Sequence, residues 1–149
     1  NPNSAVWIND LKILCKGIYD PNNSLNNTEA ILVRVHPWNM EVVWTQNLSN
    51  IYNAQNLISE TTDTKYFFTA ADGVYQMNND GSGISQKINF TADFIDVRAE
   101  SYDLTDTTSA YANMLYVNDA NTIYKYNTTT STFCDTIVVD GAIKDIAFY

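Results

Sequence analysis

Along most of the chain, apolar and polar side chains alternate residue by residue, which is the period of a β-strand with one buried face. Residues 66–88 show this best, because two turn signals separate three short apolar runs. Asp72-Gly73 suits a two-residue hairpin, since Gly accepts a positive φ, and Asn78–Gly83 suits a longer turn. The best helical candidate, Ile51–Ile58, is short and rich in Asn. The pattern therefore predicts an all-β chain of antiparallel strands.

Similar units lie on both sides of this stretch. The segments ILVRVHP, GVYQMNN and TIYKYNT begin at positions 31, 73 and 122, and each follows an apolar strand and precedes a turn and another strand. Four strands that recur at roughly 40–50 residues are typical of a β-propeller blade. We expect residues 1–149 to form a single all-β unit of about three antiparallel four-stranded blades. The blades are expected at approximately 5–48, 51–90 and 93–140, with 141–149 starting or closing a further blade. The alternative fold is a β-sandwich.

An array of about three blades is too short to close a propeller ring, so we expect other blades to complete the ring. Propellers typically close with four to eight blades, so about three do not make a ring. An open array would leave apolar end faces and unpaired strand edges, which favour aggregation. We therefore expect a partner surface at each end. Further propeller blades, from the same longer chain or from another subunit of an oligomer, are the expected partners.

Three segments resemble known propeller blades. DGVYQMNNDGSGI (72–84) resembles the hairpin of low-density-lipoprotein-receptor-type (YWTD) propellers, although KYFF and MLYV stand where the YWTD tetrad would be. NMLYVNDANTIYKYNTTT (113–130) is similar to YVTN and NHL blades. AILVRVHPWNMEVVWTQNL (30–48) is similar to quinoprotein-like hairpins that end in Trp, here Trp44, although the other repeated residues of those blades are absent. The resemblance implies a propeller architecture and assigns no subfamily.

Composition and net charge limit the classes of binding partner that we expect. Apolar residues make up 45% of the chain and aromatic residues 13%, which suits sheets. The net charge is -9, with 8 Lys and Arg in total, so nucleic acid and anionic membrane surfaces are disfavoured as partners. No run approaches the ~20 apolar residues of a membrane span.

The positions of the cysteines and of the sequon asparagines indicate in which cellular compartment the protein works. Cys15 and Cys134 lie in strand-like surroundings, so buried free thiols are expected, and a disulfide between them stays open. Asn-x-Ser/Thr sequons favour a secreted glycoprotein that is extracellular or surface-associated. They place candidate glycosylation sites at Asn22, Asn26, Asn47, Asn89 and Asn127.

The candidate ligand-binding residues are Trp38, His36 and Asn39, in the predicted turn between two strands. A turn position makes core burial of Trp38 less expected, and an exposed Trp often marks a binding surface. His36 is the sole histidine, so a zinc site is not expected. The loop Asp80–Gly83 suits a hairpin turn better than a calcium loop. The sequence implies no metal, no cofactor and no catalytic residue.

Two functions remain open at this point. The first is a non-enzymatic binding or scaffolding module of a surface- or particle-associated propeller, contacting protein or glycan through blade loops. The alternative is a carbohydrate-active hydrolase or lyase with its site at the propeller channel. Propellers carry out both kinds of function, so the fold does not decide between them.

Overall fold

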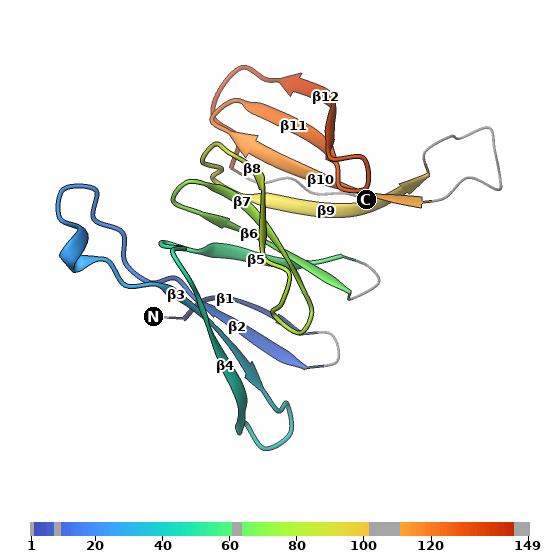
Figure 1. Ribbon diagram of the computed structural model, residues 1–149. Helices are drawn as coiled ribbons and strands as arrows, with labels where there is room; N and C mark the ends of the chain where they lie inside the picture. Colours follow the sequence, from blue (N-terminus) through green and yellow to red (C-terminus); the bar gives the residue numbers. More distant parts are fainter. Residues whose placement is uncertain (1, 8–9, 61–63, 102–110, 145–149) are drawn as a thin grey trace.

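The computed structural model describes residues 2–7, 10–60, 64–101 and 111–144, and it contains three antiparallel four-stranded sheets (Figure 1). In each sheet the strands follow one another in chain order. Sheet 1 holds β1 (Pro2–Trp7), β2 (Leu11–Cys15), β3 (Ala30–Val35) and β4 (Val42–Leu48). Sheet 2 holds β5 (Gln55–Ser59), β6 (Lys65–Ala70), β7 (Gly73–Asn78) and β8 (Ser85–Ile88). Sheet 3 holds β9 (Ile95–Ser101), β10 (Tyr111–Asp119), β11 (Thr122–Asn127) and β12 (Thr132–Val138). The expected all-β class and four-stranded antiparallel sheets are confirmed.

The turns form where the sequence places Gly, Asn and Asp. Gly73 follows Asp72 in the β6–β7 hairpin and has φ +155°, and a Cβ there would overlap the carbonyl oxygen of Ile88. In the β10–β11 hairpin Ala120 takes φ 52°. A short helical turn, η1 (Ser24–Asn26), lies in the β2–β3 loop, where the side chain of Asn23 accepts a hydrogen bond from the backbone N–H of Leu25. Hairpins joined by short turns therefore build each sheet locally.

The three sheets share one internal irregularity. The register shifts between the third and fourth strands of every sheet, at Arg34/Val35, Val74/Tyr75 and Lys125/Tyr126. A bulge of this kind increases the twist of the outer strand pair. The repeat seen in the sequence is therefore also a repeat of backbone geometry.

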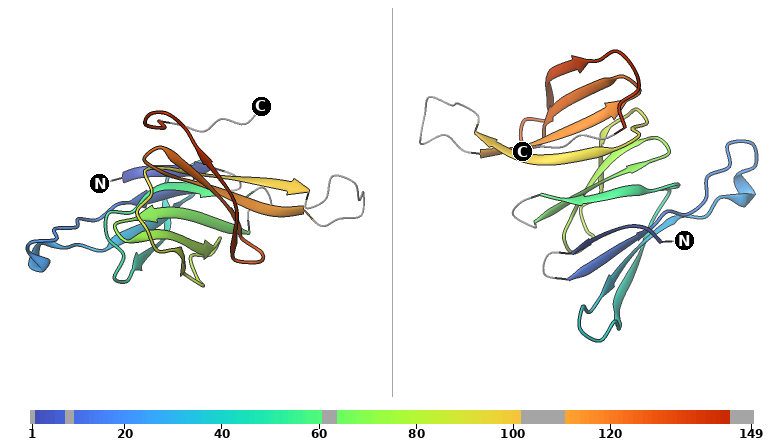
Figure 2. Two further views of the ribbon diagram at one scale, coloured as in Figure 1. Left: turned by 90° about the horizontal axis from the view of Figure 1, so that it is seen from above. Right: turned by 180° about the vertical axis from the view of Figure 1, so that it is seen from behind.

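The sheets stack in chain order, with sheet 2 between the other two (Figures 1 and 2). Strand β5 lies beside β1 on one side and beside β9 on the other. Tyr66 and Phe68 pack against Leu14 and Leu32 of sheet 1 in one apolar core. Phe67 belongs to a second core together with residues of sheet 3. Adjacent strand residues point to opposite faces, so sheet 2 is buried on both sides.

Sheet 1 and sheet 3 have no such cover on both sides within the described residues, and the array is open (Figure 2). The side chains of β12 are all exposed. On sheet 1, the face turned away from sheet 2 carries Trp7, which is 60% exposed. Trp7 is exposed because it lies on the outer side of the first sheet, opposite Val6, which packs against the core.

The sequence-based expectation of two buried thiols is corrected in part. Cys15 is half-buried, but Cys134 is exposed, because it lies on β12 at the edge of sheet 3. Both thiols are free. Residues 51–54, the first half of the helical candidate, form a loop, and β5 follows. In this loop the backbone N–H of Ala54 donates to the carbonyl oxygen of Lys16 (2.8 Å). No helix in the described part of the chain is long and apolar enough to cross a membrane.

Candidate functional site

The β3–β4 turn, residues 36–41, contains the three residues that the sequence singled out. The backbone N–H of His36 donates to the carbonyl oxygen of Glu41 (2.8 Å), and that of Met40 donates to the carbonyl oxygen of His36 (2.9 Å). Met40 takes φ 58°, in the left-handed region. These bonds close a compact loop, so the side chains that lie on it are held in place by the hairpin beneath.

The turn divides its side chains into two groups. The Nδ2 of Asn39 donates to Oε2 of Glu41 (2.8 Å), and the Oδ1 of Asn39 accepts from the backbone N–H of Glu41 (3.2 Å). Asn39 therefore stabilises the turn, and its amide is largely engaged there. Trp38 is 85% exposed and Met40 is 61% exposed, while His36 also lies at the surface. The structure thus places Trp38, His36 and Asn39 together at one hairpin tip.

The hairpin tip continues into the outer face of sheet 1. Trp7, Leu11, Val35 and Val42 are register partners across the four strands and form one row at this end of the sheet. The next row begins with Ala5, Ile13 and Val33. The first row is apolar, and the second is apolar up to Thr45, the register partner of Val33 on β4. We call this surface the outer face of sheet 1, defined by the seven apolar residues of these rows and Val43.

Large exposed apolar side chains are not spread evenly. Among the described residues they all lie on sheets 1 and 3 or on the segments that adjoin those sheets, and none lies on β5 to β8. They are Trp7, Ile18, Tyr19, Leu25, Trp38, Met40, Val42, Val43, Phe133, Ile137, Val138 and Val139. An uneven distribution of this kind is typical of surfaces that contact another molecule.

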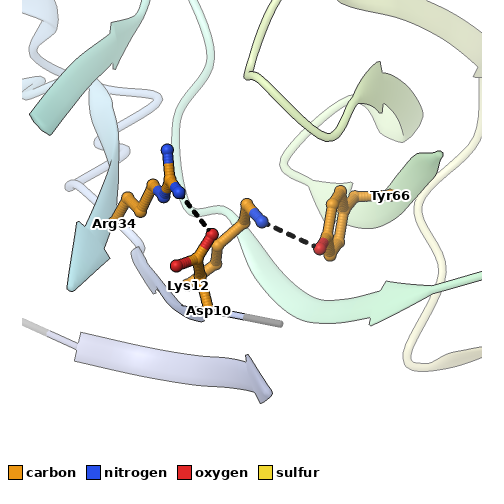
Figure 3. A network of polar contacts seen from close by, with 4 residues as sticks. All are labelled: Asp10, Lys12, Arg34 and Tyr66. Carbon is orange, nitrogen blue, oxygen red and sulfur yellow. Dashed lines mark hydrogen bonds and ion pairs between the residues drawn. The ribbon is translucent and has the colours of Figure 1, made fainter. Parts of the chain in front are cut away.

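A polar network lies at the boundary between sheets 1 and 2 (Figure 3). The Nζ of Lys12 donates to Oη of Tyr66 (3.0 Å), and Lys12 and Tyr66 are 4% and 0% exposed. Nearby, Nη2 of Arg34 pairs with Oδ2 of Asp10 at 2.6 Å. A buried ammonium group is costly unless it is hydrogen-bonded, so the phenol oxygen stabilises Lys12 in place. The contact links β2 to β6 and fixes one sheet against the next.

A polar cleft of about 490 Å³ lies between strand β4 of sheet 1 and strands β7 and β8 of sheet 2. Its wall contains four amide side chains, three hydroxyl groups, one carboxylate and two isoleucines, and no Lys, Arg or His. The lining residues are Gln46, Asn47, Ser49, Asn50, Ile51, Asp72, Tyr75, Ile84, Ser85 and Gln86. Sequence analysis did not find this cleft, because its residues come from segments far apart in the chain.

Tyr75 and Asp72 form a hydrogen-bonded pair in the cleft. The Oη of Tyr75 donates to Oδ2 of Asp72 (2.8 Å), and the Tyr75 ring stacks on Phe68 with centroids 5.6 Å apart. Burial raises the pKa of Tyr75 to about 12, with the hydrogen bond to Asp72 and its negative charge adding to the effect. The phenol therefore stays protonated at neutral pH and orients the carboxylate. The Nε2 of Gln86 donates to the carbonyl oxygen of Asp72 (2.9 Å) and supports the same turn.

The sequon asparagines differ in accessibility. Asn22, Asn26, Asn47 and Asn89 have exposed side chains. Asn127 is fully buried, and its Oδ1 accepts from the backbone N–H groups of Thr129 and Thr130. A buried amide that caps a turn is a poor acceptor for a glycan. Glycosylation at the four exposed positions stays a prediction.

Potential metal-ligating side chains are dispersed over the described residues. No group of three or more His, Cys, Asp or Glu side chains gathers there in a way that could hold a metal ion. In the Asp80–Gly83 segment, the side chain of Ser82 lowers the pKa of Asp80. The backbone N–H of Ser82, which donates to Oδ1 of Asp80 (2.8 Å), lowers it further. The segment forms the expected hairpin turn between β7 and β8.

The comparisons with known proteins give no family for this chain. No protein-family model matches it, and no curated protein matches it.

Proposed function

We propose that this chain is a segment of a β-propeller and serves as a non-enzymatic binding or scaffolding module. In this proposal it belongs to a surface- or particle-associated protein and contacts a protein or a glycan through its loops. The surface that binds the protein or glycan is the hairpin tip formed by residues 36–41. The residues that carry it are Trp38 and His36, and Asn39 holds the turn.

The arrangement of the sheets supports the propeller. Three four-stranded sheets follow one another in chain order, and the first strand of each lies beside the first strand of the next. A central sheet buried on both faces is what a blade between two other blades requires. The exposed apolar side chains of sheets 1 and 3 then mark the two faces that further blades would cover.

One observation carries the binding role, namely the exposure of Trp38. Its side chain is 85% exposed and lies beside Met40, which is 61% exposed. Folding gives little reason to place a large aromatic side chain here, because the hairpin closes through backbone bonds and through Asn39. Binding energy at protein surfaces is concentrated on such exposed aromatic residues, which become buried in the complex.

The experiment compares two exposed positions. A photoreactive amino acid replaces either Trp38 or Leu25, which is 92% exposed in the β2–β3 loop and serves as the matched control. We expect one protein or glycan to be captured from position 38 and not from position 25. The captured molecule, once purified, should bind Trp38→Ala at least tenfold more weakly than the wild-type chain, as for a hot spot worth about 1.4 kcal/mol or more.

The same experiment can also contradict the proposed role of the hairpin tip. Trp38→Ala should unfold at the wild-type temperature, because an exposed side chain contributes within about 0.5 kcal/mol to stability. Equal capture from both positions, or unchanged affinity of Trp38→Ala for the purified molecule, would contradict the proposed role of the hairpin tip.

A further inference from the structure

The polar cleft between sheets 1 and 2 has the size and lining of a small-molecule site. Its volume of about 490 Å³ lies within the usual range of ligand sites, roughly 300–1,000 Å³. The cleft is separate from the hairpin tip, since its walls come from β4, the turn after it, and β7 and β8. We propose that this cleft binds a neutral carbohydrate, and this assignment goes beyond the function proposed above.

The charge of the lining selects against anionic ligands. The only charged side chain in the wall is the Asp72 carboxylate, and no cation among the lining residues offsets it. The net charge of the whole chain, -9, acts in the same direction. A phosphate, a sulfate or an acidic sugar would therefore be repelled, while an uncharged ligand is not.

The hydrogen-bonding groups match hydroxyl groups in particular. The Nε2 of Gln46 already donates to the carbonyl oxygen of Gly81 (2.8 Å). Asn47 and Asn50 also carry amides, and an amide offers both donors and an acceptor. A sugar hydroxyl also donates and accepts, so it pairs with such a lining at both atoms. Oδ2 of Asp72 already accepts from Tyr75, which leaves Oδ1 to accept from a ligand hydroxyl.

Tyr75 supplies the apolar part of the site. Its ring is half-buried and rests on Phe68, and Ile84 lies in the same wall. An aromatic ring held in this way offers a flat surface for the C–H face of a sugar, at little cost in conformational entropy. The raised pKa of Tyr75 keeps its hydroxyl neutral, so the ring adds no second negative charge.

The test uses the 149-residue chain produced without N-glycans, so that Asn47 at the wall carries no sugar of its own. Neutral mono- and disaccharides are titrated while backbone amide resonances are followed by NMR, beside the same sugars in their uronic-acid or sulfated forms. We expect saturable shifts for at least one neutral sugar, centred on Tyr75 and Gln86, and binding of its charged forms at least tenfold weaker.

Variants of cleft residues test whether the NMR shifts arise from sugar bound in the cleft. Asp72→Asn keeps the shape of the side chain and removes its charge, and we expect it to weaken neutral-sugar binding about five- to tenfold, as for the loss of a charged acceptor. Tyr75→Phe keeps the ring but releases Asp72, and a smaller loss is expected. Leu25→Ala is the control, because Leu25 is 92% exposed in the β2–β3 loop and lines neither the cleft nor the hairpin tip, and it should bind the sugar as the wild-type chain does.

Three results would overturn the assignment. The first is the absence of saturable shifts at the cleft for every neutral sugar up to tens of millimolar. The second is a preference for acidic sugars, for an alkylamine or for a divalent cation. The third is binding that Asp72→Asn leaves unchanged although its spectrum shows a folded protein. Failure of sugar binding with a working hairpin tip would leave the proposed function intact.

Discussion

At the scale of single residues, Tyr75 links the cleft to the stability of the fold. Its pKa is raised to about 12 from the ordinary value of 10.0. A raised pKa means that the folded state holds the phenolic proton more tightly than the unfolded state does. The contribution of Tyr75 to stability is therefore fully present below pH 10 and is lost as the pH rises toward 12.

This gives a pH prediction for Tyr75→Phe. Between about pH 10 and pH 12 the free energy of unfolding of the wild-type chain should fall more steeply than that of the variant, because phenylalanine has no proton to lose. Urea unfolding at several pH values measures the slopes, and tyrosinate absorbance follows the titration. Parallel slopes for the two proteins would show that Tyr75 does not hold its proton in the folded state.

At the scale of elements, β6 connects the two cores. Phe67 and Phe68 are neighbours in the chain and are both 0% exposed, yet Phe67 packs in the core toward sheet 3 and Phe68 in the core toward sheet 1. The strand thus fixes two sheets through its alternate side chains. The buried hydrogen bond between Lys12 and Tyr66 adds a polar contact on the Phe68 side.

Phe67→Ala and Phe68→Ala form a matched pair for testing this arrangement. Each should destabilise the chain by about 3–5 kcal/mol, the usual cost of truncating a buried Phe. Hydrogen exchange should differ between them: Phe68→Ala should increase exchange mainly in β2 and β3, and Phe67→Ala mainly in β10 and β11. The same exchange pattern in both variants would mean that the two cores unfold as one unit.

At the scale of the whole molecule, the outer face of sheet 1 determines how the chain behaves in solution. Most of its register partners are apolar, and Trp7, Val42 and Val43 are 60%, 60% and 48% exposed. Removing apolar surface from water lowers the free energy by about 25 cal/mol for each Å² buried. We expect the 149-residue chain to associate through it unless further blades cover it.

Sedimentation velocity over a concentration series tests this expectation. The wild-type chain should sediment faster as its concentration rises, because association removes the face from water. Val43→Lys should shift the chain toward the monomer, since a lysine cannot be buried there without a partner. Leu25→Lys adds the same charge on an exposed loop and should change nothing. A folded wild-type monomer at every concentration would rule out association through this face.

Much of the fold could be predicted from local sequence patterns. Strand alternation, Asp72-Gly73 and the Asn-rich turns act over a few residues, so the strands and hairpins near 31–48 and 66–88 could be placed without a structure. The exposure of Trp38 could be expected because its turn position is also a local property. Trp7 and Cys134 could not be placed in this way, because alternation indicates which residues share a face and not whether that face is covered.

The sequence by itself determined the secondary structure, the repeating unit and the position of the hairpin tip, because these depend on backbone preferences and on neighbouring residues. Only the tertiary structure decided which faces of the sheets are buried, which sequon asparagine is closed to solvent, and which distant side chains meet in the cleft. Asp72 and Asn50 are separated along the chain and line one cleft because sheet 2 packs on sheet 1. That packing depends on the shapes of both sheets, which no short stretch of sequence contains.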